Sequence, residues 1–261
     1  MEDKEKELAE LRKIQEELGV ATESLNRLPI FSPTLQAKFE LRSFESKYGR
    51  ITIHGRLGQA HKNALETILF KRKAFSLKGT SLKILYNEYE VRKYLSSQGT
   101  EYNYETYQRL IKDMIQTYIK LETENFSLEG TLITRKFTAK NYSYKTRSNL
   151  PGLAGKDIAY AVIELGDVAT ALIKKELRFK YDPKPIMQLK SGISQALVRF
   201  IKTHKHHPAA GYHLRELVAN LTENTEGQNW RNIKRFLKKD AECLRGLGIA
   251  IDFENNRLYV V

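Results

Sequence analysis

The chain has 261 residues, of which 41% are hydrophobic and 29% are charged. These proportions are ordinary for a soluble globular protein and argue against bulk disorder. The 44 Lys and Arg residues outnumber the 31 Asp and Glu residues and give a formal net charge of +13. A surplus of that size favours a polyanionic partner, namely DNA, RNA or an acidic membrane surface.

Several classes of protein are excluded by what the sequence lacks. No uninterrupted apolar run approaches the ~18 residues that span a bilayer, and the charged start of the chain lacks the apolar stretch of a signal peptide. We therefore expect a cytoplasmic protein without a membrane partner. The one cysteine, Cys243, excludes an internal disulfide and a cysteine-based zinc site. Its place within a helical pattern predicts a small buried core residue.

Residues 1–28 are expected to form an N-terminal helix. Apolar residues recur there at alternating spacings of three and four, which is a short heptad pattern that Gly19 interrupts. The pattern fits a coiled coil that joins two protomers into a homodimer, and it also fits a single helix docked on its own domain or a frayed tail. Its members are Leu11, Ile14, Leu18, Ala21, Leu25 and Leu28.

Residues 29–140 are predicted to form a first domain. Period-two alternation indicates a β-hairpin at its start, and the period then changes to that of helices. Helix, strand, helix, helix and hairpin follow one another, which is the element order of a winged helix. The predicted elements are strands at 38–44 and 50–54, a helix at 57–69, a strand at 81–86, a helix from its N-cap Asn87 to Gly99, a helix at 104–118, and strands at 118–122 and 127–137.

Residues 141–157 belong to a stretch rich in Ser, Thr, Asn, Gly and Lys and are predicted to be a linker. Much the same order of elements then appears again in 158–261, without a close sequence repeat. The expected fold class is therefore α+β, with two tandem winged-helix domains behind an N-terminal helix. The predicted elements of the second domain are a strand at 159–165, helices at 168–177, 193–201 and 214–218, a long helix at 227–247, and a hairpin with strands at 249–253 and 258–261.

The helix at 104–118 is the first candidate recognition helix. Its apolar residues share one stripe at helical spacing, so its polar residues face away from the core. Gln and Arg side chains fit adenine and guanine edges in the major groove; an ordinary solvated helix face is the alternative. Arg135 and Lys136, on the outgoing wing strand, are expected to reach a phosphate or the minor groove. The candidate DNA-binding residues of the helix itself are Gln108, Arg109, Lys112 and Gln116.

The second candidate recognition helix is the front part of the long helix, at 228–239. Five cations within nine residues form an electrostatic footprint for DNA, with a solvated charge run as the alternative. Lys side chains are expected to contact phosphates, whereas Arg231 and Arg235 are expected to read bases. Arg257, after the tight turn at 254–256, is expected to reach a phosphate or the minor groove. The candidate DNA-binding residues of the helix are Asn229, Arg231, Asn232, Lys234, Arg235, Lys238 and Lys239.

No motif indicates covalent chemistry, a metal or a cofactor. The run 204–207 brings three histidines together, but no carboxylate lies at metal-ligand spacing and Pro208 follows, so a basic turn is the better interpretation. The run 152–157 lacks the spacing and the hydroxyl of a phosphate-binding loop. We therefore expect no catalytic residue, no metal and no cofactor.

The last hundred residues or so, from about Val162 to Val261, resemble the C-terminal winged helix of the TrfA-type plasmid replication initiators. The resemblance is carried by Ile163-Glu164-Leu165, the Tyr181 loop, Leu189-Lys190-Ser191 with Ala196-Leu197, and the runs 200–204, 214–217 and 230–237 leading to Leu244 and Gly248. The first domain agrees with that family in element order alone.

This resemblance implies a protein that binds repeated origin sequences (iterons) in double-stranded DNA. It also implies that the protein helps to open the origin and recruits host replication proteins, namely the host initiator, the helicase and the sliding clamp. In that family the C-terminal recognition helix, here 228–239, makes the larger share of base contacts. Dimers of such initiators are inactive stores, and monomers bind the origin.

Three classes of function stay open at this point. The leading hypothesis is an iteron-binding initiator whose two recognition helices reach successive major grooves, about 34 Å apart. The alternative is a winged-helix transcriptional regulator that acts as a homodimer through the seam from Leu11 to Leu28. Direct repeats in the DNA site favour the initiator, and an inverted repeat favours the regulator. A nicking replication enzyme would require a divalent metal and a covalent tyrosine adduct.

Overall fold

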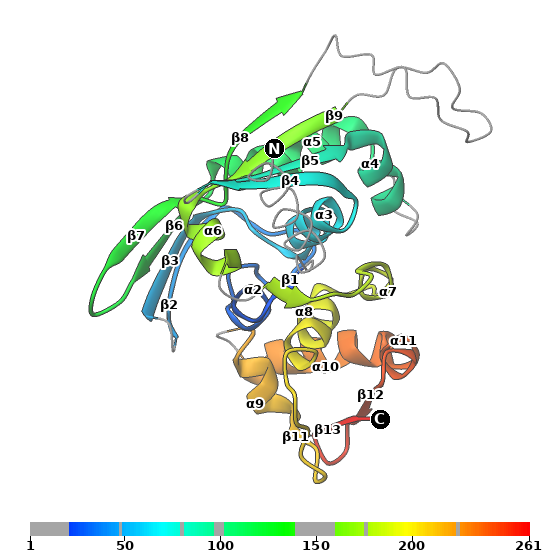
Figure 1. Ribbon diagram of the computed structural model, residues 1–261. Coiled ribbons are helices and arrows are strands. Elements are labelled where there is room, and N and C mark those ends of the chain that lie inside the picture. Colours follow the sequence, from blue (N-terminus) through cyan, green and yellow to red (C-terminus); the bar gives the residue numbers. More distant parts are fainter. Residues whose placement is uncertain are drawn as a thin grey trace, which may run out of the picture.

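Two bodies, each with its own hydrophobic core, make up the described part of the chain. The computed structural model describes residues 21–46, 49–78, 81–96, 102–138, 160–174, 177–222 and 225–261. The first body holds two four-stranded sheets and lies in the upper part of Figure 1, whereas the second holds a cluster of helices and a small sheet below it. We call the described residues up to Phe179 the first body and those from Lys184 onward the second body.

The first sheet of the first body has four antiparallel strands in the order β2-β3-β6-β7. The predicted hairpin at its start is present as β2 and β3. β6 pairs with β3, so the hairpin of β6 and β7, predicted as a wing, is instead the far half of a larger sheet. The strands are β2 (Glu40–Ser46), β3 (Gly49–Gly55), β6 (Tyr118–Glu122) and β7 (Ser127–Thr131).

The second sheet has the order β4-β5-β9-β8. The run predicted as one strand at 127–137 divides at the buried Leu132, after which β8 enters this second sheet. At the junction the backbones come so close that a Cβ on Gly166 would lie 1.9 Å from the carbonyl oxygen of Thr131. The strands are β4 (Arg72–Lys78), β5 (Ser81–Asn87), β8 (Ile133–Thr138) and β9 (Tyr160–Leu165).

β9 corrects the predicted domain boundary. This strand was expected to begin the second domain, but it pairs with both β5 and β8 of the first body. Its alternate residues Ala161, Ile163 and Leu165 are buried in the first core, so leaving that sheet would expose them to water. The second body therefore begins in the 180s. The predicted linker 141–157 lies outside the described residues.

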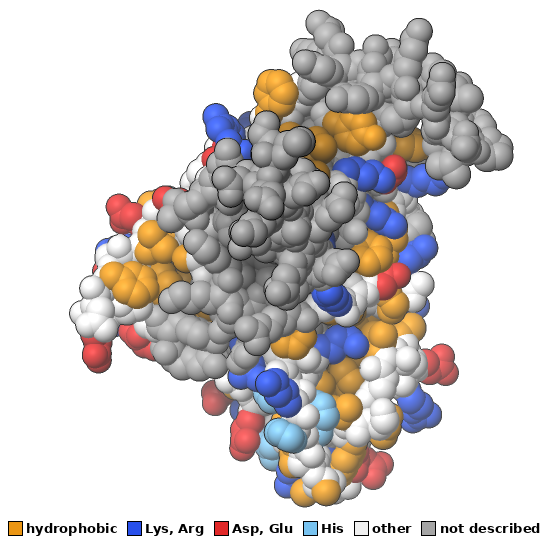
Figure 2. Space-filling view, in the orientation of Figure 1, with side chains coloured by type: hydrophobic (Ala, Val, Ile, Leu, Met, Phe, Trp, Pro, Cys, Tyr) orange, Lys and Arg blue, Asp and Glu red, His pale blue; other side chains and the backbone are white. Residues whose placement is uncertain are grey.

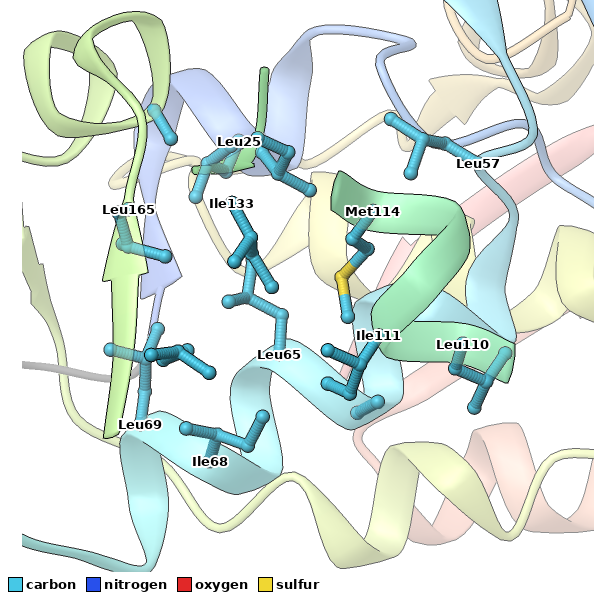
Figure 3. Packing of buried hydrophobic residues seen from close by; sticks show 14 of the residues in the cluster. Leu25, Leu57, Leu65, Ile68, Leu69, Leu110, Ile111, Met114, Ile133 and Leu165 are labelled. Carbon is cyan, nitrogen blue, oxygen red and sulfur yellow. The ribbon is translucent and has the colours of Figure 1, made fainter. Parts of the chain in front are cut away.

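Three helices pack against each other and against these sheets. Leu65 of α3 lies beside Ile111 and Met114 of α5, and Leu69 at the other end of α3 lies beside Leu165, as Figure 3 shows. α5 buries one stripe at spacings of three and four and leaves its opposite face exposed, whereas α3 is buried on nearly all sides. The helices are α3 (Gln59–Phe70), α4 (Glu88–Ser96) and α5 (Tyr104–Gln116).

The start of the described chain packs onto the first body. Leu25 and Leu28 are 3% and 7% exposed within its core. These two members of the predicted dimer seam therefore pack inside their own chain, because that core shields their apolar surface. Ala21 lies in the short strand that opens the described chain, and Leu11, Ile14 and Leu18 lie outside the described residues. The elements of this region are β1 (Ala21–Thr22), α2 (Glu23–Arg27), α6 (Asp167–Lys174) and β10 (Leu177–Phe179), which pairs with β1.

The second body is a winged helix. Five described helices of this body precede the hairpin of β12 and β13, to which the short strand β11 adds in the order β11-β13-β12. Asn256 makes the hairpin turn with a φ of 51°, a conformation that asparagine tolerates. The elements are α7 (Lys184–Met187), α8 (Gly192–Ile201), β11 (Tyr212–His213), α9 (Leu214–Ala219), α10 (Gly227–Lys239), α11 (Ala241–Gly246), β12 (Ile249–Asp252) and β13 (Arg257–Val260).

The long helix predicted at 227–247 is broken at Asp240. The buried carboxylate of Asp240 accepts hydrogen bonds from the backbone nitrogens of Lys190 (2.8 Å) and Ser191 (3.0 Å). Since a buried carboxylate needs such partners, Asp240 adopts a non-helical φ of −102° and the chain restarts as α11. Cys243 on α11 is exposed rather than buried as predicted, because Leu244 takes the inward position.

A buried polar network joins α8 of the second body to α3 of the first. The fully buried guanidinium of Arg199 donates to Glu66 from Nε at 3.0 Å and from Nη2 at 2.7 Å. Gln59 and Asn63 accept from Nη1 and Nη2 at 2.9 and 2.7 Å, and the Tyr181 hydroxyl donates to Glu66 at 2.8 Å. We call these five residues the joint network. Because each charge is unsatisfied without the others, the network fixes how the bodies meet.

Candidate nucleic-acid interface

α9 and α10 form the helix-turn-helix of the second body. Leu217 of α9 and Ile233 and Leu237 of α10 are buried in the common core. Arg215 Nε donates to the backbone oxygen of Thr225 at 3.1 Å, which ties α9 to the turn between the helices. A second helix anchored by one face in this way presents its opposite face outward, where a major groove can receive it.

The outward face of α10 is cationic. Arg231, Arg235 and Lys239 are exposed and spaced four residues apart, so they share one face. The segment of α10 contains no acidic residue. Across the described residues, none of its five cations takes part in an ion pair, so the charges are available to phosphates and base edges. The five are Arg231, Lys234, Arg235, Lys238 and Lys239.

Two of these lysines lie over aromatic rings. Lys234 Nζ is 5.7 Å from the ring centroid of Trp230, and Lys238 Nζ is 5.3 Å from that of Phe253 in the wing turn. Such contacts hold an ammonium group in place without neutralising its charge. They position one cation along the flank of α10 and another between α10 and the wing.

Gln228 is a functional candidate that the sequence analysis missed. It is exposed on the first turn of α10, three residues before Arg231 and thus on the same face. The first residues of a recognition helix contact base edges, and a glutamine amide fits adenine. The sequence feature that could have identified Gln228 is its position directly after Gly227, where α10 begins. Asn229 and Asn232, which were predicted, are half-buried beside this face.

The wing of the second body is short and closed. The Asp252 carboxylate accepts hydrogen bonds from the backbone nitrogens of Glu254 and Asn255, both at 3.0 Å. Hydrogen bonds from Asn255 lower the pKa of Asp252, so the turn stays closed at neutral pH. Arg257 is half-buried, and its Nη1 donates to the carbonyl oxygen of Gly211 at 3.4 Å. A phosphate contact by Arg257 would require this hydrogen bond to break.

α5 holds the corresponding place in the first body, and its charge is different. Arg109, Lys112 and Gln116 are exposed and share one face of α5, as the sequence predicted. Glu105 lies on the same exposed face, and Asp113 follows Lys112 directly. The helix therefore carries two cations and two acids, and its own charge sums to zero, so it attracts DNA far less than α10 does.

The structure corrects the roles predicted for Gln108 and Lys136. Lys136 Nζ lies 3.0 Å from Glu88 Oε2 and donates to Gln108 Oε1 at 2.9 Å, while the Gln108 amide donates to Glu88. The Lys136 and Glu88 side chains are only 10% and 6% exposed. Burial lowers the pKa of Lys136, and the Glu88 carboxylate opposes that shift. These side chains hold α4, α5 and β8 together and are not offered to a groove.

Arg135 is the other predicted cation of β8. Its side chain is 68% exposed, and its Nε pairs with the Glu164 carboxylate of β9. Hydrogen bonds from Ser81 and from Arg135 lower the pKa of Glu164. An exposed ion pair of this kind contributes little stability, so a phosphate could replace Glu164 at small cost. The predicted DNA contact of Arg135 stays a prediction.

The histidine run lies at the surface of the second body, with His204 half-buried and His206 and His207 exposed. His204 Nδ1 lies 3.0 Å from the backbone oxygen of Phe200, and His207 Nδ1 lies 2.8 Å from the Tyr212 hydroxyl. Figure 2 shows histidine side chains gathered in the lower part of the molecule beside Lys and Arg. Among the described residues no group of three His, Cys, Asp or Glu side chains is placed to hold a metal.

None of the described helices combines the length and apolar character that crossing a bilayer requires.

No protein-family model matches the chain, and no curated protein matches it in sequence. Among solved structures, selenomethionine derivatives of domains 2 and 3 of RctB superpose with a TM-score of 0.54 at 15% identity, over 85% of each chain. The chain has the fold of those two domains. A second structure of RctB domains 2 and 3 gives a TM-score of 0.47 at 13% identity, over 87% of this chain and 86% of that one. The likeness to the first structure shows the mixed helix and sheet, winged-helix-type fold.

Proposed function

We propose that this protein is a replication initiator that binds repeated sequences in double-stranded DNA, with α10 as its principal recognition helix. The observation that carries the proposal is the unpaired cationic face of α10, on the second helix of a helix-turn-helix that a β-hairpin follows. Two likenesses support it. The segment 162–261 resembles TrfA-type plasmid initiators, and the fold is shared with RctB, which is a replication initiator.

In this proposal α10 enters the major groove by the face opposite its buried stripe. Gln228, Arg231 and Arg235 face base edges, where arginine forms two parallel hydrogen bonds to guanine and glutamine does so to adenine. The lysines at 234, 238 and 239 contact phosphates, which set the register of the helix without reading sequence. Because α10 contains no acidic residue, nothing in the helix repels the backbone.

The first body takes a smaller part. Its helix α5 offers Arg109, Lys112 and Gln116 to a neighbouring groove or backbone. The opening of adjacent DNA and the recruitment of the host initiator, helicase and sliding clamp enter the proposal by resemblance alone. The protein acts in the cytoplasm by binding, without a metal, a cofactor or a covalent step.

Footprinting of the purified full chain on DNA that flanks its own gene tests the proposal. We expect protection of tandem direct repeats of about 20 base pairs, which is two helical turns. The double variant Arg231→Ala/Arg235→Ala should lose the footprint. The control Lys202→Ala/Lys205→Ala should keep it, since it removes two exposed cations that lie outside α10.

Two outcomes would overturn the proposal. Protection of a single inverted repeat would identify a homodimeric transcriptional regulator, and an unchanged footprint with the arginine variant would show that α10 is not the reader.

A further inference from the structure

A cleft of about 880 Å³ lies between the two bodies. On the first body it is lined by the segment 35–39, by Arg56 and by one flank of α5. On the second body it is lined by the segment 187–190, which leads from α7 into α8, and by Gln195. The cleft thus separates α5 from the body that carries α10.

The lining of this cleft is strongly cationic. Asp113 is the one acidic side chain among its described lining residues. Asp113 Oδ2 already lies 3.8 Å from Arg56 Nη1, which balances its charge within the first body, and 3.3 Å from His61 Nε2, whose pKa burial lowers. The lining holds four cations from four separate segments, of which Arg56 is the partner of Asp113; they are Lys38, Arg56, Arg109 and Lys190.

Three of these cations are unpaired. Lys38, Arg109 and Lys190 form no ion pair with any other residue that the structure describes, and Arg109 and Lys190 are exposed. Like charges gathered without counter-charges repel one another, which destabilises the free protein. Such an arrangement is relieved when a polyanion binds, and this distinguishes the cleft from a purely structural feature.

The second rim of the cleft is fastened to the end of α10. The backbone nitrogens of Lys190 and Ser191 donate to the buried carboxylate of Asp240, the residue that follows Lys239. The backbone of Lys190 therefore lies beside the residue that follows Lys239, so the second rim of the cleft adjoins the cationic end of α10.

We propose that this cleft binds the sugar-phosphate backbone of the duplex between the grooves that α5 and α10 face. The inference rests on the proposed function. Two successive major grooves are about 34 Å apart, and a minor groove bordered by phosphates lies between them. A chain that reaches both grooves must pass over those phosphates. Cations spread over both rims fit an extended backbone, whereas a small anion requires donors that converge on one point.

The test uses fluorescence anisotropy with the double variant Lys38→Ala/Lys190→Ala. On a duplex of about 20 base pairs, which spans both bodies, we expect an affinity loss of about 5- to 10-fold per lysine at about 0.1 M salt, and a salt slope smaller by about two. On a duplex of about 10 base pairs, which holds the α10 site alone, the variant should bind like the wild type. Base preference should be unchanged in both cases, because phosphate contacts carry no sequence information.

The control Lys202→Ala/Lys205→Ala should leave the affinity for both duplexes unchanged, and thermal unfolding should show that all variants are folded. If the cleft variant binds the long duplex with wild-type affinity and slope while Arg235→Ala weakens it, this inference fails and the proposed function stands. If Arg235→Ala has no effect either, the proposed function fails as well. Stoichiometric pyrophosphate binding that needs Lys190 and leaves DNA affinity unaltered would make the cleft a small-anion site and overturn the inference.

Discussion

α5 and α10 are each the second of two helices that precede a β-hairpin, yet only α10 carries a net positive charge. Each buries one apolar stripe in its own core. α10 has five cations and no acid, whereas α5 has two of each. Polar residues of α5 also serve their own body, since Gln108 bonds Glu88 and Lys136. A place in a helix-turn-helix therefore does not by itself make a recognition helix, because the helix must also present a net positive charge to the DNA.

The two hairpins differ in the same direction. In the second body β12 and β13 meet one short strand, and their turn projects as a small wing. In the first body β6 and β7 are extended by β3 and β2 into a wide sheet. From this comparison we infer that the first body mainly supports and positions the second body, and that the second body reads the DNA sequence.

The largest expected effect on stability comes from the joint network, because it fixes the position of the second body, which carries α10, relative to the first body, which carries α5. Arg199→Ala leaves the Glu66 carboxylate buried without its cation, which should lower the free energy of unfolding by about 3–5 kcal/mol. Urea denaturation measures this loss. Arg199→Lys, which keeps the charge but loses the planar fork, should lose less. A variant as stable as wild type would show that the bodies are not held by this network.

A second prediction concerns Lys62, which lies beside the joint network. Burial lowers its pKa to about 7, against the attraction of Glu66, and its Nζ donates to the Leu25 carbonyl oxygen at 2.6 Å. Above this pKa the unfolded chain, whose lysine pKa is about 10.4, binds the additional proton. The stability contribution of Lys62 therefore rises with pH, by about 2 kcal/mol from about pH 7 to about pH 9.

Urea denaturation of wild type and Lys62→Met across that pH range isolates this contribution, because every other titrating group is common to both. The variant should be the more stable protein at neutral pH, and its advantage should shrink as the pH rises. Parallel curves for the two proteins would contradict the account of Lys62.

The third prediction sharpens the contrast within α5 and its neighbours. Lys136→Met leaves Glu88 without its cation in a nearly closed site, so the free energy of unfolding should fall by about 1–2 kcal/mol. DNA affinity of the folded protein should be unchanged. The matched variant Lys112→Ala removes an exposed lysine of α5 and should leave stability within about 0.5 kcal/mol. A loss of DNA affinity with Lys136→Met would instead show that Lys136 contacts DNA.

Local patterns in the sequence predicted much of the second body. Helical spacing, the Pro208 break and the asparagine turn at 255–256 placed α8, α9, the start of α10 and the hairpin correctly. The Asn87 cap of α4 was also correct, since its Oδ1 accepts from Glu90 N at 3.2 Å. These features depend on neighbours within a few residues, which a sequence displays.

The errors arose where the answer depended on distant residues. β9 has the alternation of any strand, and nothing local shows that its partners are β5 and β8. Gln108 and Arg109 are both polar residues of one helix, and only the tertiary position of Glu88 separates their roles. The break at Asp240 likewise depends on Lys190 and Ser191, about fifty residues earlier. Long-range pairing of this kind leaves no periodic signal.

The central claim is that α10, and not α5, reads the DNA sequence. Equilibrium binding of Arg235→Ala and Arg109→Ala to one footprinted repeat and its single-base variants tests it most directly. Arg235→Ala is expected to lose about 1–3 kcal/mol and to relax the preference at one base pair. Arg109→Ala is expected to weaken all sequences alike, as a phosphate contact does. Relaxed base preference with Arg109→Ala and intact preference with Arg235→Ala would contradict the claim.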